Sequence, residues 1–268
     1  MIKDLFIRSE RGTRIPATVW ANEDCKGILL MAHSFRSDRK EDGRYVKIAQ
    51  KAYENGLNVI GMDFPGNGES EEAFSSYSLT SCLDDMESCF RYMEKERPFR
   101  KKRMILLGYS MGGRLISLFL EKHREFSELV FWAALNRSFR EHDLFLEQDL
   151  SKLKEGCRDG ICDFYDIFEQ KHEQMSEGLV DDLMERDALA PLHSFRGRAL
   201  IVQGLKDQTI EPENAGQIYE ALDQCEDKKI VWIEGADHGF GLWDGRKEDD
   251  EILMEATLSF LGFIESGD

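Results

Sequence analysis

The chain has 268 residues, 41% of them hydrophobic, which suits one large domain or a domain with an insertion. Its formal net charge of −17 at pH 7 repels phosphate backbones and anionic lipid, so nucleic acids and membrane surfaces are poor partners. No apolar run approaches the roughly 20 residues that span a bilayer, and the charged start lacks the apolar core of a secretory signal. We therefore expect a soluble cytoplasmic protein.

Short apolar runs alternate with segments of helical periodicity along the first half of the chain. Apolar and polar residues alternate on both sides of Arg11-Gly12, which predicts two strands around a turn within residues 4–20. The next run, 27–33, is nearly all apolar, as expected of a strand buried on both faces. The elements predicted after it are a helix over 43–56, a strand over 57–64, a helix over 79–98, a strand over 103–109, a helix over 111–124 and a strand over 128–134.

The alternation resumes near the other end of the chain. The elements predicted there are a strand over 198–204, a helix near 213–222, a strand over 228–235 and a closing helix from about 247 to 265. Alternating strands and helices call for an α/β fold, with a mostly parallel sheet covered by helices on both faces.

Residues 136–194 break this rhythm. They carry fifteen acidic and seven basic residues, with few of the Gly, Ser and Pro residues that a linker contains. Apolar residues at helical spacing in this segment are Phe164, Phe168, Met175, Leu179 and Leu183. We therefore predict an α/β core formed by residues 1–135 and 195–268, with a helical lid inserted at 136–194.

The six cysteines are scattered, and we expect reduced thiols, some of them buried as small apolar side chains. Cys157 and Cys162 flank a short turn, where a disulfide or half of a metal site is the alternative. The segment that starts at His172 begins like a zinc-binding helix, but Ser176 stands where the second histidine is needed. We expect neither a metal nor a cofactor.

Ser110 lies in a G-x-S-x-G motif, Gly108–Gly112, between the strand 103–109 and the helix that follows it. Glycines on either side allow the strand and the helix to approach without Cβ clashes. The sharp turn lifts the serine hydroxyl above the sheet edge, and the backbone N–H of Met111 at the helix start is available for negative charge. The motif predicts a nucleophilic serine with Met111 as one oxyanion donor.

A serine hydroxyl needs a base within hydrogen-bond reach. His238 follows the strand 228–235 in a loop bracketed by glycines, at the same sheet edge as Ser110. Asp207 follows the strand 198–204, and it completes the chain order Ser, Asp, His that this arrangement has in an α/β sheet. Asp237 is a rival, but a residue adjacent to a histidine rarely folds back onto its Nδ1. We therefore predict a triad of Ser110, His238 and Asp207.

A second oxyanion donor is expected from the loop after the strand 27–33, and the N–H of Phe35 is the candidate. The Phe35 side chain is also a candidate wall of the acyl pocket. In the insertion, Phe139, Phe164 and Tyr165 are candidate substrate-binding residues; the alternative is that they pack within the lid's own core.

These motifs resemble the α/β-hydrolase superfamily, and they are most similar to the bacterial cinnamoyl (feruloyl) esterases and related carboxylesterases. The segment DFPGNGES at 63–70 resembles the D-x-x-G-x-G-x-S turn of that group, and IEGADHGF at 233–240 resembles its histidine loop. The resemblance implies an α/β-hydrolase fold, ester hydrolysis through an acyl-enzyme without a cofactor, and a lid that selects the substrate. The group usually has His-Gly-Phe in the oxyanion loop, whereas this chain has His33-Ser34-Phe35.

We therefore expect a serine carboxylesterase that acts on small esters, with hydroxycinnamoyl or short acyl groups. Three alternatives stay open. The same triad serves acyl transfer or thioester hydrolysis, and it also serves an aminopeptidase, whose substrate's free amino terminus an acidic lid would attract. The third alternative is a ligand-binding α/β-hydrolase without activity. A small-molecule ester is the expected partner, and the oligomeric state is not predicted.

Overall fold

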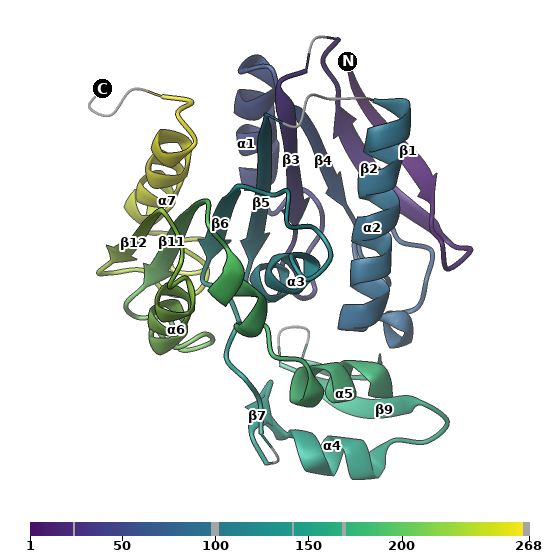
Figure 1. The fold of residues 1–268 in the computed structure, drawn as a ribbon. Helices are drawn as coiled ribbons and strands as arrows, with labels where there is room; N and C mark the ends of the chain where they lie inside the picture. The colour runs from purple at the N-terminus through teal and green to yellow at the C-terminus, as the bar shows by residue number, and fades with distance from the viewer. Residues whose placement is uncertain (24, 98–101, 141, 168–169, 265–268) are drawn as a thin grey trace.

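The computed structural model describes residues 1–23, 25–97, 102–140, 142–167 and 170–264. Within these residues an eight-stranded sheet forms the centre, in the order β1-β2-β4-β3-β5-β6-β11-β12 (Figure 1). The strands are β1 (Ile2–Arg8), β2 (Arg14–Trp20), β3 (Gly27–Ala32), β4 (Asn58–Met62), β5 (Arg103–Tyr109), β6 (Glu128–Trp132), β11 (Arg198–Gly204) and β12 (Asp227–Ile233). β2 pairs antiparallel with β1 and with β4, and all other neighbours are parallel.

Helices cover both faces of this sheet, and the side chains of β3 show why its sequence is apolar throughout. Ile28 and Leu30 belong to one buried apolar cluster, and Leu29 and Met31 belong to the other. The second cluster includes residues of α1 (Arg44–Glu54) and α7 (Lys247–Phe260), and the first includes residues of α2 (Leu79–Glu96), α3 (Met111–Phe119) and α6 (Glu213–Ala221). The predicted parallel sheet with helices on both faces is confirmed.

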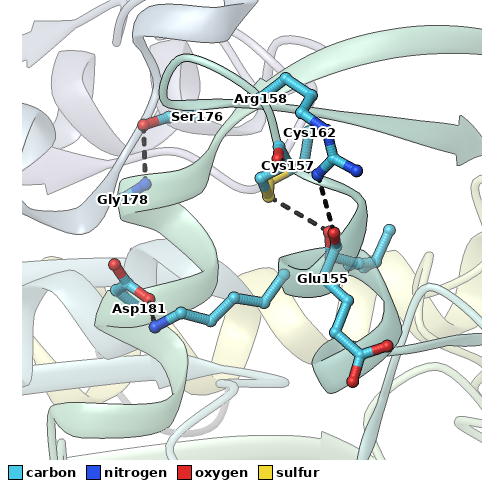
Figure 2. The surroundings of a disulfide bond; sticks show 9 residues. Glu155, Cys157, Arg158, Cys162, Ser176, Gly178 and Asp181 are labelled. Carbon is cyan, nitrogen blue, oxygen red and sulfur yellow. Dashed lines mark hydrogen bonds and ion pairs between the residues drawn. A yellow bond between two sulfur atoms is a disulfide. The ribbon is translucent and has the colours of Figure 1, made fainter.

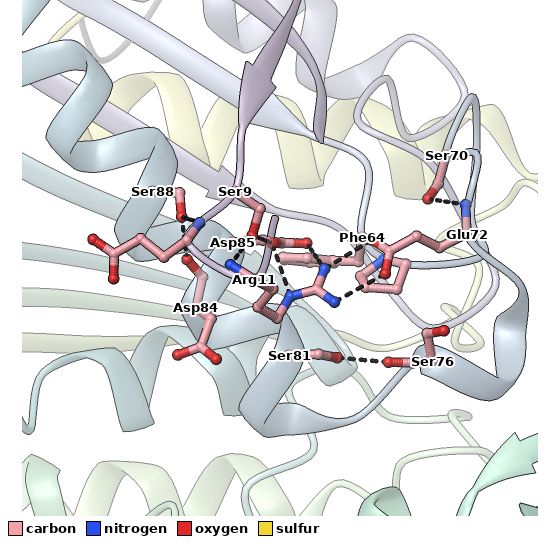
Figure 3. Close-up of polar contacts among 12 residues, drawn as sticks. Ser9, Arg11, Phe64, Ser70, Glu72, Ser76, Ser81, Asp84, Asp85 and Ser88 are labelled. Carbon is pink, nitrogen blue, oxygen red and sulfur yellow. Dashed lines mark hydrogen bonds and ion pairs between the residues drawn. The ribbon is translucent and has the colours of Figure 1, made fainter. Parts of the chain in front are cut away.

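A buried ion network joins the β1–β2 turn to α2. Arg11 Nη2 lies 2.8 Å from Glu72 Oε1 and 2.8 Å from Asp85 Oδ2. Ser9 Oγ donates a hydrogen bond of 2.7 Å to Asp85, as Figure 3 shows. Burial raises the pKa of Asp85 against the opposing effect of Arg11. The network fixes the outer hairpin of the sheet on the helix behind it.

Part of the chain between β6 and β11 forms a cap beyond the carboxyl ends of the parallel strands (Figure 1). We call residues 144–185 the cap. Its elements are β7 (Leu144–Phe145), β8 (Gln148–Asp149), α4 (Leu150–Gly156), β9 (Ile161–Asp166), β10 (Lys171–Ser176) and α5 (Glu177–Glu185). A 3-10 helix, η2 (Ala190–Ser194), leads back to β11.

The prediction of a helical insertion is correct for α4 and α5 and wrong for β7, β8, β9 and β10, which are strands. β9 and β10 pair as an antiparallel hairpin, in which Phe164 lies opposite Glu173. Cys162, Phe164 and Asp166 are buried while the residues between them are exposed. This period of two belongs to a strand, and the wider spacing of the apolar residues along 164–183 concealed it. Phe168 lies outside the described residues.

A disulfide joins Cys157, just after α4, to Cys162 in β9 (Figure 2). The prediction of reduced thiols is wrong at this pair, whereas Cys82 and Cys89 are buried thiols whose pKa is raised by burial. Close to the disulfide, an ion pair between Lys154 and Asp181 joins α4 to α5. The covalent and ionic links thus join α4 to β9 and to α5 within the cap.

None of the described helices combines the length and the apolar character that crossing a membrane requires.

Gly112→Ala is expected to destabilise the fold, because a Cβ there would lie 2.0 Å from the carbonyl oxygen of Ala32. Gly216→Ala is the matched control, since Gly216 also lies in a helix and a Cβ there would meet nothing within 4 Å. We expect the free energy of unfolding to fall by more than about 2 kcal/mol in the first variant and to rise by about 0.5–1 kcal/mol in the second. Chemical denaturation measures both values, and equal stabilities would contradict the close packing of α3 on β3.

Candidate active site

Ser110 occupies a strained turn between β5 and α3, with φ 53° and ψ −116°. Its N–H donates a 2.8 Å bond to Trp132 O, and its own carbonyl accepts a 3.0 Å bond from the N–H of Leu135. The neighbouring glycines give the space that the turn needs, because a Cβ at Gly108 would lie 2.3 Å from the carbonyl oxygen of Gly112. The sequence pattern therefore gives the local geometry that it predicted.

The loops after β11 and β12 bring Asp207 and His238 to this serine. His238 Nε2 lies 3.1 Å from Ser110 Oγ, and His238 Nδ1 lies 2.8 Å from Asp207 Oδ2. All three residues are at most 7% exposed. Because an ionised carboxylate only accepts hydrogen bonds, Nδ1 carries the proton and Nε2 is left to accept the serine proton. The arrangement can draw a proton from the hydroxyl.

Asp207 is itself held by four hydrogen bonds. Its Oδ1 accepts from the N–H of Thr209 at 2.9 Å and of Ile210 at 2.8 Å, and its Oδ2 accepts from Gln203 Nε2 at 3.1 Å in addition to the histidine. Asp237, the rival carboxylate in the sequence, makes no hydrogen bond to the ring of its neighbour His238. The loop that carries Asp237 packs tightly on the end of β11, where a Cβ at Gly204 would lie 2.3 Å from the carbonyl oxygen of Ala236.

Two buried side chains hold residues 33–36, which we call the oxyanion loop because it carries the predicted donor Phe35. His33 Nε2 accepts a 3.1 Å bond from the N–H of Phe64, so its Nδ1–H donates to Ser34 O at 2.7 Å. Burial lowers the pKa of His33, in agreement with this neutral form. Glu41 accepts a 2.5 Å bond from the N–H of Ser34. Both contacts act on the residue that replaces the usual glycine.

Burial raises the pKa of Glu41 to about 7, although hydrogen bonds from Ser34 and Ser37 oppose this shift. Glu41 is 2% exposed and lines the same cavity as Ser110. Glu41 was not predicted from the sequence, where an isolated glutamate in a charged loop gives no signal.

A cavity of about 690 Å³ opens beside Ser110 and His238. Of the predicted residues, Phe35, Met111 and Phe139 line it. The ring of Phe35 also packs edge-on, at centroid distances of 5.3 Å from Phe74 and 5.5 Å from Phe145. The described cavity therefore has a wall made by the oxyanion loop and the cap together.

Phe164 and Tyr165, the other two predicted substrate-binding residues, are not among the residues that line this cavity. Phe164 is 1% exposed and packs against Phe74, with ring centroids 6.0 Å apart. Tyr165, its neighbour in β9, faces the opposite way, is 39% exposed and contacts His172. Strand alternation separates the two rings onto opposite faces of β9.

Several cavity residues were missed by the sequence analysis. They include Arg36, Asp42, Tyr109, Arg137, Leu144, Glu147, Glu211, Leu242 and Trp243. Trp243 lies 5.8 Å from the ring of His238, measured between centroids, and its place five residues after the histidine was a usable signal. Leu144 and Glu147 of the cap gave no signal, because their position at the cavity depends on contacts between segments that are distant in the sequence.

The sheet order, the strained serine turn and the two loops beyond β11 and β12 are arranged as in the α/β-hydrolase fold. The chain resembles the esterase Est1E from Butyrivibrio proteoclasticus, solved with ferulic acid bound, with a TM-score of 0.73 and 16% identity over 96% of this chain and 98% of the other. It also resembles a putative hydrolase from Agrobacterium vitis, with a TM-score of 0.73 and 18% identity over 99% of each chain. The chain has the α/β-hydrolase fold.

Within that fold, residues 24–153 match the family described as "Serine aminopeptidase, S33". A monoacylglycerol lipase from Mycolicibacterium smegmatis is 28% identical over 122 residues, which are 44% of this chain. The matched region spans 42% of that lipase, so the chain aligns with less than half of the relative's length. The family match includes the serine turn at Ser110.

Glu41→Gln is expected to change how stability depends on pH. Because the fold raises the pKa of Glu41 from 4.5 to about 7, the folded wild type loses stability as pH rises between these values, by about 3 kcal/mol. The variant keeps an acceptor for the Ser34 N–H and lacks this loss. Unfolding free energies at pH 5 and pH 8 should therefore shift in favour of the variant at the higher pH.

The control for this experiment is Glu54→Gln, at an exposed glutamate whose pKa is lowered by hydrogen bonds from Gln50 and Lys51. It should show no gain over wild type as pH rises. The raised pKa of Glu41 is contradicted when the free energies of unfolding of the two variants depend on pH in the same way.

Proposed function

We propose that this protein is a serine carboxylesterase that hydrolyses small carboxylic esters through an acyl-enzyme. The observation that carries the proposal is the chain of hydrogen bonds from Ser110 Oγ through His238 to Asp207, at 3.1 Å and 2.8 Å, beside an open cavity. The esterase and lipase relatives support this class of reaction. We assign no cofactor and no metal to it; no cluster of metal-binding side chains occurs in the described part of the chain.

In the proposed mechanism, Ser110 Oγ attacks the ester carbonyl while His238 Nε2 takes its proton. The charge that develops on the carbonyl oxygen is stabilised by the backbone N–H groups of Met111 and Phe35. His238 then protonates the leaving alcohol and afterwards activates a water molecule, which releases the acid and restores the serine. Asp207 keeps the ring in the required tautomer and stabilises its cationic form.

The apolar walls of the cavity favour an aromatic or short acyl group. Phe35, Phe139 and Phe145 line one region, and Trp243 lies beside the histidine. Ring edges and faces of this kind pack on flat apolar groups. The ferulic acid bound in the Butyrivibrio esterase is a molecule of this shape. We therefore propose hydroxycinnamoyl and short acyl esters as the substrate class.

An aminopeptidase is the second candidate, and two observations favour it. Asp42, Glu147 and Glu211 line the cavity, so carboxylates are available for a substrate's free amino terminus. The matched family is described as a serine aminopeptidase. The two candidates are separated by initial rates on 4-nitrophenyl acetate and butyrate, methyl ferulate, and aminoacyl 4-nitroanilides with free and blocked amino groups. Cleavage of only the anilides with a free amino group would refute the esterase proposal and identify an aminopeptidase.

We propose a cytoplasmic location, in line with the buried thiols Cys82 and Cys89. The Cys157–Cys162 disulfide favours an oxidising compartment instead. Thiol alkylation in freshly lysed producing cells, with and without prior reduction, separates the two locations. An oxidised pair at native expression level would overturn the cytoplasmic assignment.

Ser110→Ala is expected to lower the turnover of 4-nitrophenyl acetate by at least about 10⁴-fold, because the nucleophile is lost. Asp207→Asn should lower kcat by about 100-fold or more, since the ring loses the acceptor that fixes its tautomer. Asp237→Asn is the matched control at the rival carboxylate and should keep turnover close to wild type. Unchanged hydrolysis by the Ser110 variant would refute the proposed function, and a large loss in the Asp237 variant would refute the choice of acid.

A further inference from the structure

Arg36 directly follows the proposed oxyanion donor Phe35, and its side chain reaches across to the cap hairpin. Arg36 Nε lies 2.7 Å from Asp166 Oδ2 in β9, and Arg36 Nη2 lies 2.6 Å from Glu173 Oε2 in β10. The arginine side chain is 12% exposed, that of Asp166 is completely buried and that of Glu173 is 20% exposed. These contacts join segments more than 125 positions apart in the sequence.

The aromatic ring of Phe74 supports both residues of the loop. The guanidinium carbon of Arg36 lies 4.2 Å from the centre of this ring, and the ring of Phe35 lies 5.3 Å from it. Phe74 begins η1 (Phe74–Ser76), a 3-10 helix next to β10. The loop is therefore fixed between the core and the cap by one stacked cation and one packed ring.

The backbone at Arg36 depends on these contacts. Its φ of 63° lies in the left-handed region, which costs a non-glycine residue free energy unless the surroundings enforce it. Two carboxylates, desolvated together with one guanidinium that lies 2.7 Å and 2.6 Å from them, supply that enforcement, because loss of the cation would remove the counter-charge that Arg36 gives to both. The direction of the chain at residues 35–36 thus follows the position of the cap hairpin.

We propose that Arg36 is a positioning residue, which sets the Phe35 amide for the oxyanion by anchoring the loop to β9 and β10 of the cap. This inference rests on the proposed function. It makes the cap hairpin part of the oxyanion site: the cap shapes the cavity and also holds one of the two donors in place. Arg36 lines the cavity as well, so direct substrate binding is the alternative that the experiment must separate.

The experiment compares Arg36→Met, Arg36→Lys and Arg14→Met in hydrolysis of 4-nitrophenyl acetate, a substrate too small to reach far into the cavity. Arg14 is the matched control, because it also combines an ion pair, with Glu71 at 2.5 Å, and a stacked ring, Phe6 at 4.3 Å. It lies on the outer hairpin and does not line the cavity.

We expect Arg36→Met to lower kcat by about 10- to 100-fold, a large part of the effect of losing one oxyanion donor, with KM within about twofold of wild type. Binding of a trifluoromethyl ketone, which forms an oxyanion on Ser110, should weaken by the same factor. Asp166→Asn should show the same split, and the double variant should lose little more than either single one. Arg36→Lys, which keeps the charge, should recover part of the loss, and Arg14→Met should match wild type.

Two results would overturn the proposal. One is a kcat for Arg36→Met within twofold of wild type in a protein with an unchanged melting temperature. The other is a rise in KM with kcat intact, which would make Arg36 a substrate-binding residue. Should Arg36→Met fail to fold, Arg36→Lys and Glu173→Gln are compared in its place with the same ketone, and unchanged ketone binding in both would also overturn it.

Failure of this inference is distinct from failure of the proposed function. The wild type and Ser110→Ala are assayed first with the same ester. An inactive wild type, or an active Ser110 variant, refutes the function itself. With the function intact, the Arg36 series alone decides the positioning role.

Discussion

The strained turn at Ser110 is the constraint from which the rest of the site follows. Two hydrogen bonds hold its backbone. The N–H of Ser110 donates to the carbonyl oxygen of Trp132 at the end of β6, and the carbonyl oxygen of Ser110 accepts from the N–H of Leu135 just beyond that strand. The turn also requires α3 to pack so closely on β3 that a Cβ at position 112 would clash with the carbonyl oxygen of Ala32, so only glycine fits there. Because the serine is fixed in this way, two loops from neighbouring strands need only reach one defined point. The histidine and its carboxylate do so, and their hydrogen bonds lock the arrangement.

The core was predictable because local sequence and global fold agree there. Strands buried on both faces read as continuous apolar runs, glycines mark the turn, and the parallel topology puts the ends of β5, β11 and β12 at one edge. Asp207 could be preferred over Asp237 on chain geometry alone, and the hydrogen bond to His238 involves Asp207. The roles of these residues stay proposals, but their meeting point followed from sequence order.

The cap was less predictable, and its residues show why. Phe164 and Met175 are spaced like residues of one helix face, yet they lie on opposite strands of a hairpin. Cys157 and Cys162 were expected to be reduced thiols, with a disulfide or half of a metal site as the alternative, and the structure joins them in a disulfide. Arg36 pairs with carboxylates that are distant in the sequence, and Glu41 accepts a hydrogen bond from the backbone N–H of Ser34. Neither contact leaves a pattern in the sequence. Local periodicity carries no information about such contacts.

The insertion leaves the core after β6 and returns at β11, and these two strands pair directly. Asn136, at the start of the insertion, donates a 3.4 Å hydrogen bond to the carbonyl oxygen of Ala188 near its end. The two ends are therefore neighbours, so a segment of different length or shape can be grafted between them without disturbing the sheet. A graft of this kind would exchange the walls of the cavity while the nucleophile, base and acid stay on the scaffold. The ion pairs of Arg36 set the limit of this modularity: a transplanted cap has to bring its own acidic partners for the arginine, or the loop beneath it loses its anchor.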